Sequence, residues 1–207
     1  MFQKESKIPE ADFKLKGKVV FFATNNINKF NEARKVLAEH GVAVGMLRVK
    51  AAEIQSDSLS EIAEASAVDA FKRCQLPVIV EDAGLFVEAL NGFPGPYSAY
   101  AYKTLGNAGL LKLMKNVKNR KAKFQSAIAY CDSLSRAPVC FEGASSGTIT
   151  FEEHKRNVRP SFGFDPVFKP LGSTKSFAEM TLKEKNDFSH RAEAVRKFAE
   201  WYNRHGS

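Results

Sequence analysis

Short apolar runs alternate with amphipathic stretches through the first half of the chain. Three buried β-strands are predicted from runs that are apolar and rich in valine: Lys18–Ala23, Val44–Val49 and Pro77–Val80. Between them, apolar residues recur at helical spacing over Asn28–Gly41 and Ser58–Arg73. Each of these two segments opens on a side chain that can cap a helix, so we expect two helices there.

The second half of the chain predicts antiparallel strands and a final helix. Three segments have the composition of strands: Phe124–Cys131, Pro138–Gly143 and Gly147–Phe151. A turn is expected at Ser145–Gly147. Ser189 can cap a last helix, because apolar residues follow it at helical spacing. Strand–helix alternation followed by a strand meander predicts an α/β fold with a mixed sheet flanked by helices.

Length and composition are those of a soluble globular protein. The chain has 207 residues, 44% hydrophobic and 26% charged, and no apolar run approaches the roughly 20 residues that span a bilayer. Residues 1–17 are charged throughout and lack the apolar core of a secretory signal. We therefore expect a loose leader there, before a single domain over residues 18–207. Three cysteines without close pairing indicate free thiols and a cytoplasmic location.

The formal net charge of +8 favours an anionic partner. The anionic partner could be nucleic acid, a membrane surface or a phosphorylated small molecule. A basic surface with no partner explains the same charge. Lys118–Lys123 is the only dense basic patch. No aromatic side chain interleaves with it, so a platform for stacking single-stranded nucleic acid is poorly supported. Charge therefore leaves the class of partner open.

The first segment that could carry chemistry is Thr24–Lys29, which follows a buried strand and opens a helix. Free backbone N–H groups, the Lys29 ammonium and the side chains of Thr24 and Asn26 could hold a phosphate there. Asn25 is of a residue type that tolerates left-handed backbone angles. An ordinary capped turn explains the same residues, and the glycines of a Walker loop are absent.

The second segment is the acidic pair Glu81 and Asp82, which ends the third apolar run. Adjacent strand residues point to opposite faces, so one of the two carboxylates would enter a given cleft. Mg²⁺ takes such oxygen ligands, usually one or two carboxylates together with substrate phosphates and water. The alternative is a strand end that is simply solvated.

The third segment is Ser189-His190-Arg191, at a helix start, with Lys185 just upstream. The basic side chains suit a phosphate or the carbonyl of a base. A nucleophilic serine–histidine pair is not supported, because neighbours on a first helical turn rarely align for proton transfer. The alternative is a solvated helix surface.

In chain order these segments resemble the inosine triphosphate pyrophosphatase family, from about Lys18 to Tyr202. The resemblance rests on four collinear motifs, each weak alone. They are Thr24-x-Asn26-x-x-Lys29-x-x-Glu32, Glu81-Asp82-Ala83-Gly84-Leu85 continuing to Tyr97-Ser98, Phe162-Gly163-Phe164-Asp165-Pro166, and Glu184-Lys185-x-x-x-Ser189-His190-Arg191.

The resemblance implies hydrolysis of ITP, dITP and XTP to the monophosphate and pyrophosphate, by an elongated mixed sheet in two lobes around a central cleft. It implies a homodimer that needs neither nucleic acid nor a membrane. It also implies Mg²⁺ as cofactor, with Mn²⁺ as a substitute, held by Glu53 and Asp82, and it makes Asp82 the catalytic residue that activates water. The substrate-binding residues that it implies are Thr24, Asn25, Asn26, Lys29, Ala83, Phe162, Gly163, Phe164, Asp165, Lys185, His190 and Arg191.

Two features depart from the family pattern. Asn25 stands where the family often has glycine, and a family lysine expected on the Ser58–Arg73 helix is absent. The candidate positions for that lysine are Ser66 and Val68, and Lys72 lies one or two turns away. Two rival functions stay open from the residues: a related pyrophosphatase for modified pyrimidine nucleotides, and a basic nucleic-acid-binding module without catalysis.

Overall fold

The computed structural model describes residues 18–49, 51–52, 54–154 and 162–206. The strands are β1 Lys18–Ala23, β2 Val42–Leu47, β3 Val78–Val87, β4 Pro94–Gly95, β5 Lys121–Cys131, β6 Val139–Ile149 and β7 Phe168–Pro170. Within the described residues they form one seven-stranded sheet in the order β2-β1-β3-β5-β6-β7, with β4 paired to β3. β1 is parallel to β2 and β3, and the other pairs are antiparallel. The predicted α/β fold with a mixed sheet is confirmed.

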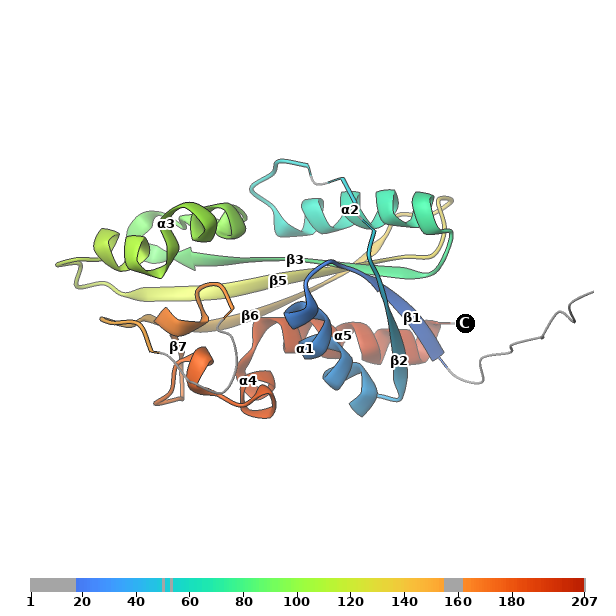
Figure 1. Cartoon of the computed structure of the whole chain (residues 1–207). Coiled ribbons are helices and arrows are strands. Elements are labelled where there is room, and N and C mark those ends of the chain that lie inside the picture. Colours follow the sequence, from blue (N-terminus) through green and yellow to red (C-terminus); the bar gives the residue numbers. More distant parts are fainter. Residues whose placement is uncertain (1–17, 50, 53, 155–161, 207) are drawn as a thin grey trace, which may run out of the picture.

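Helices cover both faces of this sheet. They are α1 Ile27–Glu39, α2 Leu59–Cys74, α3 Ser98–Leu113, α4 Leu182–Phe188 and α5 His190–His205, with short 3₁₀ turns at Glu88–Leu90, Asp165–Val167 and Phe177–Glu179. α2 and α3 lie above the sheet and α1, α4 and α5 below it in Figure 1. Among the helices of the described residues, none has both the length and the apolar character needed to traverse a bilayer.

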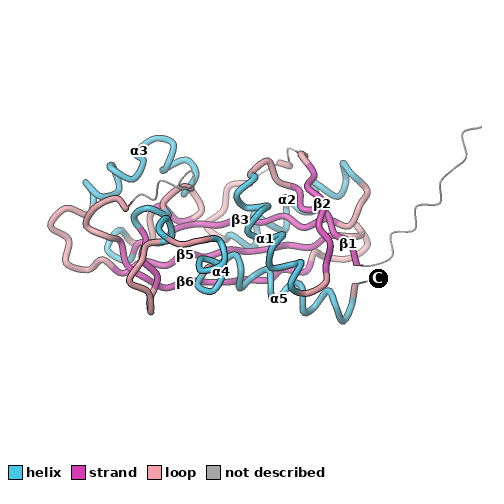
Figure 2. Tube along the Cα trace, turned by 60° about the horizontal axis from the view of Figure 1, so that its bottom comes forward, coloured by secondary structure: helices cyan, strands magenta, loops and turns pink. Residues whose placement is uncertain are grey.

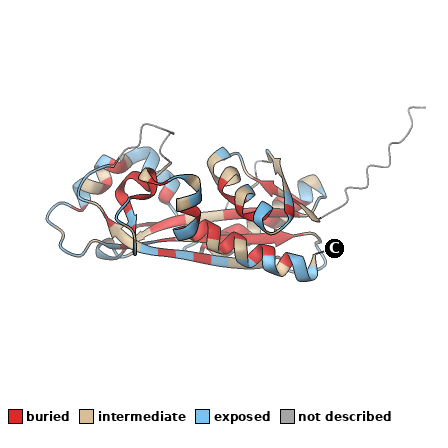
Figure 3. Ribbon diagram, turned by 90° about the horizontal axis from the view of Figure 1, so that it is seen from below, coloured by how far each residue is buried: buried red, intermediate tan, exposed pale blue. Residues whose placement is uncertain are grey.

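The long strands β3, β5 and β6 connect two lobes, with α3 at one end and α1, α2 and α5 at the other (Figure 2). We call the part around β1, β2, α1, α2 and α5 the proximal lobe, and the part around α3, β4 and β7 the distal lobe. In the proximal lobe, Phe22 and Ile79 pack against α1 and α5, whereas their neighbours Ala23 and Val78 pack against α2. A separate core around Phe168 fills the distal lobe. In Figure 3, buried positions run along the strands, and exposed positions lie on the outer faces of the helices.

Several predicted boundaries were wrong. The strand predicted at Pro77–Val80 continues to Val87, so Glu81 and Asp82 lie in the middle of β3 and not at its end. The turn predicted at Ser145–Gly147 is instead part of β6, which is paired continuously with β5. The small residues Ser145–Gly147 suggested a turn, but within the sheet their small size lets the neighbouring strand β7 lie close to β6. A Cβ on Gly147 would lie 2.3 Å from the Lys169 carbonyl oxygen of β7.

Candidate active site

A cleft of about 760 Å³ lies where the two lobes meet. The β1–α1 loop and the first turn of α1, Thr24–Lys29, line it from the proximal lobe, and Tyr102 and Phe162–Asp165 line it from the distal lobe. Asp82 and Ala83 of β3 and the first residues of α5 complete the wall. The cleft brings together the substrate-binding residues of the sequence analysis, except Lys185, which is buried behind Asp165. Glu53, the second predicted metal ligand, lies outside the described residues.

The β1–α1 loop forms a capped helix start. Asn26, and not the predicted Asn28, is the N-cap of α1: its Oδ1 accepts hydrogen bonds from the backbone N–H groups of Asn28 at 3.0 Å and Lys29 at 3.2 Å. Thr24 Oγ1 in turn accepts from Asn26 N at 3.1 Å. The Asn26 side chain therefore already occupies two of the N–H groups that the sequence analysis offered to a phosphate. Asn25 is not among the described residues with positive φ, so it replaces the family glycine without strain.

Glu81 is the carboxylate around which this end of the cleft is organised. Lys29 Nζ lies 2.7 Å from Glu81 Oε2, and Arg191 Nε lies 3.0 Å from Glu81 Oε1. Ser126 Oγ donates to that same Oε1 at 2.7 Å. Burial alone would raise the pKa of Glu81, but Arg191 and Lys29 outweigh it and hold the pKa well below its ordinary value. Glu81 is therefore ionised and already well occupied, whereas Asp82, the next residue, is half-buried at the cleft wall.

Glu32 of α1 organises the other end of the same network. Its Oε1 accepts from Lys185 Nζ at 2.7 Å, and its Oε2 accepts from Arg191 Nη1. Lys185 Nζ also donates to Asp165 Oδ2 at 2.6 Å. Burial would raise the pKa of Glu32, but Lys185 and Arg191 lower it to about 2. Burial raises the pKa of Asp165 despite the ammonium beside it. Opposite charges therefore alternate from Lys29 to Asp165.

The start of α5 places His190 and Arg191 against the sheet, both nearly inaccessible to solvent. Gly143 of β6 permits this approach, since a Cβ there would lie 2.1 Å from the His190 carbonyl oxygen. The His190 ring stacks on Phe124, with ring centroids 4.7 Å apart. Burial, and then the charge of Arg191, lowers the pKa of His190 well below its ordinary value, so the imidazole is neutral at pH 7. Its Nδ1 is buried without a hydrogen-bond partner among the described residues.

The loop Phe162–Asp165 forms the distal wall. Gly163 has a φ of +54°, a conformation that a side chain at this position would strain. Phe164 is only 4% exposed and meets Tyr102 edge-on, with ring centroids 5.5 Å apart. The family resemblance implies Phe162 and Phe164 alike as substrate-binding residues, but Phe164 is largely in the core. Phe162 is half-buried, and Tyr102, which sequence reasoning missed, is 38% exposed at the cleft wall.

The two positions for the absent family lysine have different surroundings on α2. Ser66 is 2% exposed, and its Oγ donates to the carbonyl oxygen of Ala52 at 3.1 Å. Ala51, the preceding residue, lines the cleft. Val68 instead packs against the apolar core between α2 and the sheet. Ser66 is therefore the position beside the cleft.

Among the described residues, no three His, Cys, Asp or Glu side chains cluster as a metal site would require. The described carboxylates that line the cleft are Glu81, bound by Lys29 and Arg191, Asp165, bound by Lys185, and Asp82. This donor set fits a hard cation of the Mg²⁺ type, which is commonly bound by one or two carboxylates and completed by substrate phosphates and water.

Comparisons with known proteins agree with one another. A family model described as the Ham1 family matches residues 20–201. The dITP/XTP pyrophosphatase of Methanopyrus kandleri is 49% identical over 183 residues, which cover 88% of this chain and 95% of that protein. The dITP/XTP pyrophosphatase of Thermococcus kodakarensis is 49% identical over 180 residues, which cover 87% of this chain and 95% of that protein. The solved Ham1 protein of Staphylococcus aureus aligns with a TM-score of 0.75 and 28% identity, covering 90% and 98%. The solved HAM1 protein of Coxiella burnetii aligns with a TM-score of 0.76 and 26% identity, and the alignment covers 90% of this chain and 99% of that one.

Proposed function

The chain belongs to the Ham1 family, and from this membership we propose that it hydrolyses dITP, ITP and XTP to the monophosphate and pyrophosphate. The observation that carries the proposal is a single cleft with two chemically different ends. Lys29 and the start of α1 suit phosphates at one end, and Asp165, His190 and Arg191 suit a base at the other. The match of relatives along nearly their whole length supports assigning the same reaction to this chain.

The charge balance of the cleft supports a divalent cation, which nucleotide pyrophosphatases generally need. Three cations of the described network, Lys29, Lys185 and Arg191, face three carboxylates, Glu32, Glu81 and Asp165, and Asp82 adds a further carboxylate. These charges leave no positive surplus for a triphosphate. We propose Mg²⁺, replaceable by Mn²⁺, held by Asp82 and Glu53. When bound it would neutralise phosphate charge and lower the pKa of a coordinated water.

The protein's own groups have distinct proposed roles in the reaction. Lys29 would bind the phosphates and, with the N-terminus of α1, stabilise negative charge as water attacks the α-phosphorus. Asp82 would orient that water and accept its proton. Thr24, Asn25, Asn26 and Ala83 would form the wall along the triphosphate.

The distal end would select the base. Inosine and xanthine carry a carbonyl at C6, where adenine carries an amino group, so donor groups favour the deaminated bases. Arg191 and Lys185 are donor-only cations, and neutral His190 offers one N–H. Phe162 would cover the base plane, and Gly163 gives the loop its shape. We further propose a homodimer in the cytoplasm, where the three thiols, free in the structure, would stay reduced.

Hydrolysis of dITP in ¹⁸O-labelled water tests the reaction. Attack at the α-phosphorus puts the label into the monophosphate and releases unlabelled pyrophosphate. Phosphate and pyrophosphate are assayed separately, across a panel of purine and pyrimidine triphosphates with Mg²⁺. Label in orthophosphate with a diphosphate product overturns the proposed reaction. A preference for modified pyrimidine nucleotides overturns the proposed substrate class.

A further inference from the structure

Glu32 contacts the substrate-binding cations without itself lining the cleft. It lies on α1, one turn beyond Lys29, and is 4% exposed. Its two carboxylate oxygens accept from two different elements, Lys185 of α4 and Arg191 of α5. Its backbone carbonyl accepts from Asn186 Nδ2 at 3.3 Å. One residue of α1 thus ties together both helices that carry the basic groups at the base end.

We infer that Glu32 is a positioning residue for base recognition: its carboxylate sets the orientation of Lys185 and Arg191 toward the substrate. The inference rests on the proposed function. It assigns Glu32 no contact with the nucleotide. Its role is to act through the two cations that it holds.

The geometry of the two cations supports this role. A guanidinium is planar, so fixing Nε on Glu81 and Nη1 on Glu32 fixes the direction of its remaining Nη2 edge. Lys185 is held between Glu32 and Asp165, which directs the rest of its ammonium group. Both restraints at Glu32 come from one carboxylate. Moving that carboxylate would therefore change the orientation of the Lys185 ammonium and of the Arg191 guanidinium together.

Stability alone is a poor explanation for a charge at this position. Burying an ion pair costs desolvation that its attraction barely repays, and well-packed apolar residues often serve equally well. α1 already packs its Ala33, Val36 and Leu37 into the proximal core. A carboxylate at position 32 is explained by the two cations that it orders.

Two substitutions separate position from charge. Glu32→Asp keeps the buried charge, so the chain is expected to fold, but it withdraws the carboxylate by one methylene. Glu32→Gln keeps the shape and removes the charge. Glu193→Gln is the matched control: it makes the same chemical change on α5, at a half-exposed ion pair with Lys197 outside the cleft lining. Thermal unfolding of each variant identifies the temperatures at which it is folded.

Binding of two probes, measured by calorimetry, gives a readout that needs no turnover. Inosine monophosphate reports the base end, and tripolyphosphate reports the phosphate end. We expect Glu32→Asp to weaken inosine monophosphate roughly tenfold or more, as for a lost hydrogen bond to a charged donor. Tripolyphosphate binding should stay at the wild-type value, and Glu193→Gln should match wild type with both probes. Glu32→Gln, where folded, should also weaken inosine monophosphate and should bind tripolyphosphate no more weakly.

Kinetics give a second readout. The preference for dITP over dATP in kcat/KM should fall in Glu32→Asp, mainly through KM for dITP. Unchanged or tighter inosine monophosphate binding in Glu32→Asp overturns the inference, and so does an equal weakening of both probes. A wild-type enzyme that does not hydrolyse dITP refutes the proposed function instead.

Discussion

At the scale of single residues, Glu81 and Asp82 are neighbours in β3 whose carboxylates have different surroundings. Glu81 is fully buried and bound by Lys29, Arg191 and Ser126. Asp82 is half-buried at the cleft wall. Alternation along the strand separates the two side chains, so adjacent acids of similar chemistry are suited to different tasks.

The Asp82→Asn substitution should therefore lower kcat strongly without unfolding the protein. In its proposed role of orienting and deprotonating water, Asp82 should contribute roughly 10²–10⁴ in kcat, and asparagine is nearly isosteric with it. Steady-state kinetics with dITP at saturating Mg²⁺ measure kcat, and thermal unfolding checks the fold. Asp82→Asn with most of the wild-type turnover would remove Asp82 from the mechanism.

Glu81→Gln is the matched comparison, with the opposite expected result. Its loss leaves the buried Arg191 guanidinium short of a carboxylate, which typically costs about 3–5 kcal/mol in the free energy of unfolding. Urea denaturation of both variants under the same conditions compares them. Equal stabilities for the two variants would contradict the division of roles.

At the scale of whole elements, local patterns predicted which segments become strands and helices, but not all of their ends. Ser58 caps α2 and Ser189 caps α5 as the sequence indicated, because capping depends on residues within one turn. β3 was predicted to stop at its first charged residue, since nothing local shows that Glu81 would be neutralised. Its partner Arg191 lies 110 positions away in the sequence.

The same limit applies to the site. Segments of the four motifs line the cleft, and each motif is local in the sequence. The connections between motifs, such as Glu32 to Arg191 across 159 positions, depend on how α1 and α5 pack together. Tyr102 is a similar case. It enters the cleft from α3, at a position beyond Ser98, where the second motif ends.

Helix α2 carries the prediction of this scale, because it lacks the family lysine. Ser66→Lys should place an ammonium beside the cleft wall, with its apolar stem running past Ala51. A charge-assisted contact with phosphate is worth about 1.5–3 kcal/mol, so KM for dITP should fall about tenfold or more. Steady-state kinetics measure this change.

Val68→Lys is the control for Ser66→Lys, since it adds the same charge to the same helix at a partly buried position that packs against the apolar core. It should lower the free energy of unfolding and leave KM without improvement. If Ser66→Lys leaves KM at the wild-type value, the cleft needs no added charge at this position, or another cation such as Lys72 supplies it.

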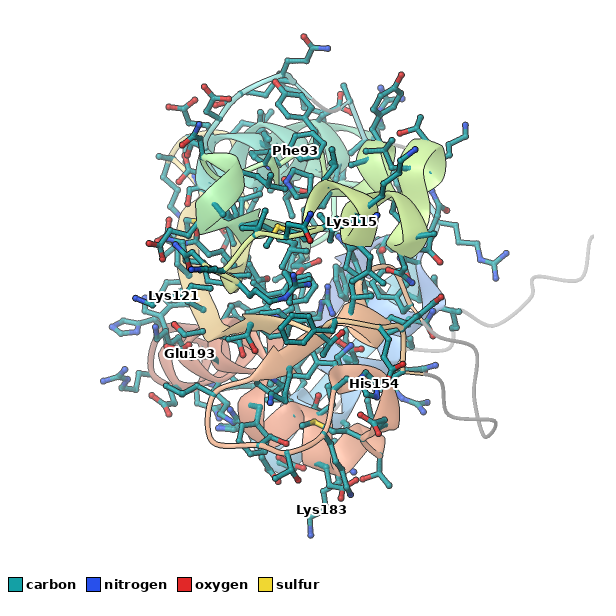
Figure 4. The ribbon with its side chains drawn as sticks, turned by 90° about the vertical axis from the view of Figure 1, so that its left-hand side faces the viewer. Phe93, Lys115, Lys121, His154, Lys183 and Glu193 are labelled. Atoms are coloured by element: carbon teal, nitrogen blue, oxygen red, sulfur yellow. The ribbon has the colours of Figure 1, made fainter. Side chains whose placement is uncertain are left out.

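At the scale of the whole molecule, the net charge of +8 is not gathered at the cleft, where the network described above is balanced. In the densest basic patch, Arg120 donates to the carbonyl oxygens of Ile149 and Met114 at 2.8 and 2.9 Å, so it serves the fold. Lys121 lies at the side of the distal lobe in Figure 4. The patch therefore offers a nucleic-acid backbone fewer available charges than its sequence suggests.

The buried ionisable groups together make the stability of the molecule depend on pH. The pKa of His190 is lowered on folding, so as the pH falls through its ordinary value of 6.5 the unfolded chain takes up a proton that the folded chain does not. Each such proton lowers the free energy of unfolding by about 1.4 kcal/mol per pH unit. Glu32, whose folded pKa is about 2 against an ordinary 4.5, adds a further loss below that ordinary value. Asp165, with a raised pKa, opposes both.

We therefore expect the free energy of unfolding, measured by urea denaturation at constant ionic strength, to fall from pH 7 to pH 5. This range is set by the ordinary histidine pKa of 6.5, at which the unfolded chain takes up its proton. His190→Gln should remove most of the His190 contribution, so its curve should fall less steeply than that of wild type over the same range. His205→Gln, at the exposed end of the same helix, controls for the loss of a histidine and should keep the wild-type slope. Because Asp165 and Glu32 remain in both variants, the difference between the curves isolates His190. If wild type and His190→Gln have parallel curves, the imidazole takes up its proton equally well in the folded and unfolded chain, and it is not held neutral in the cleft.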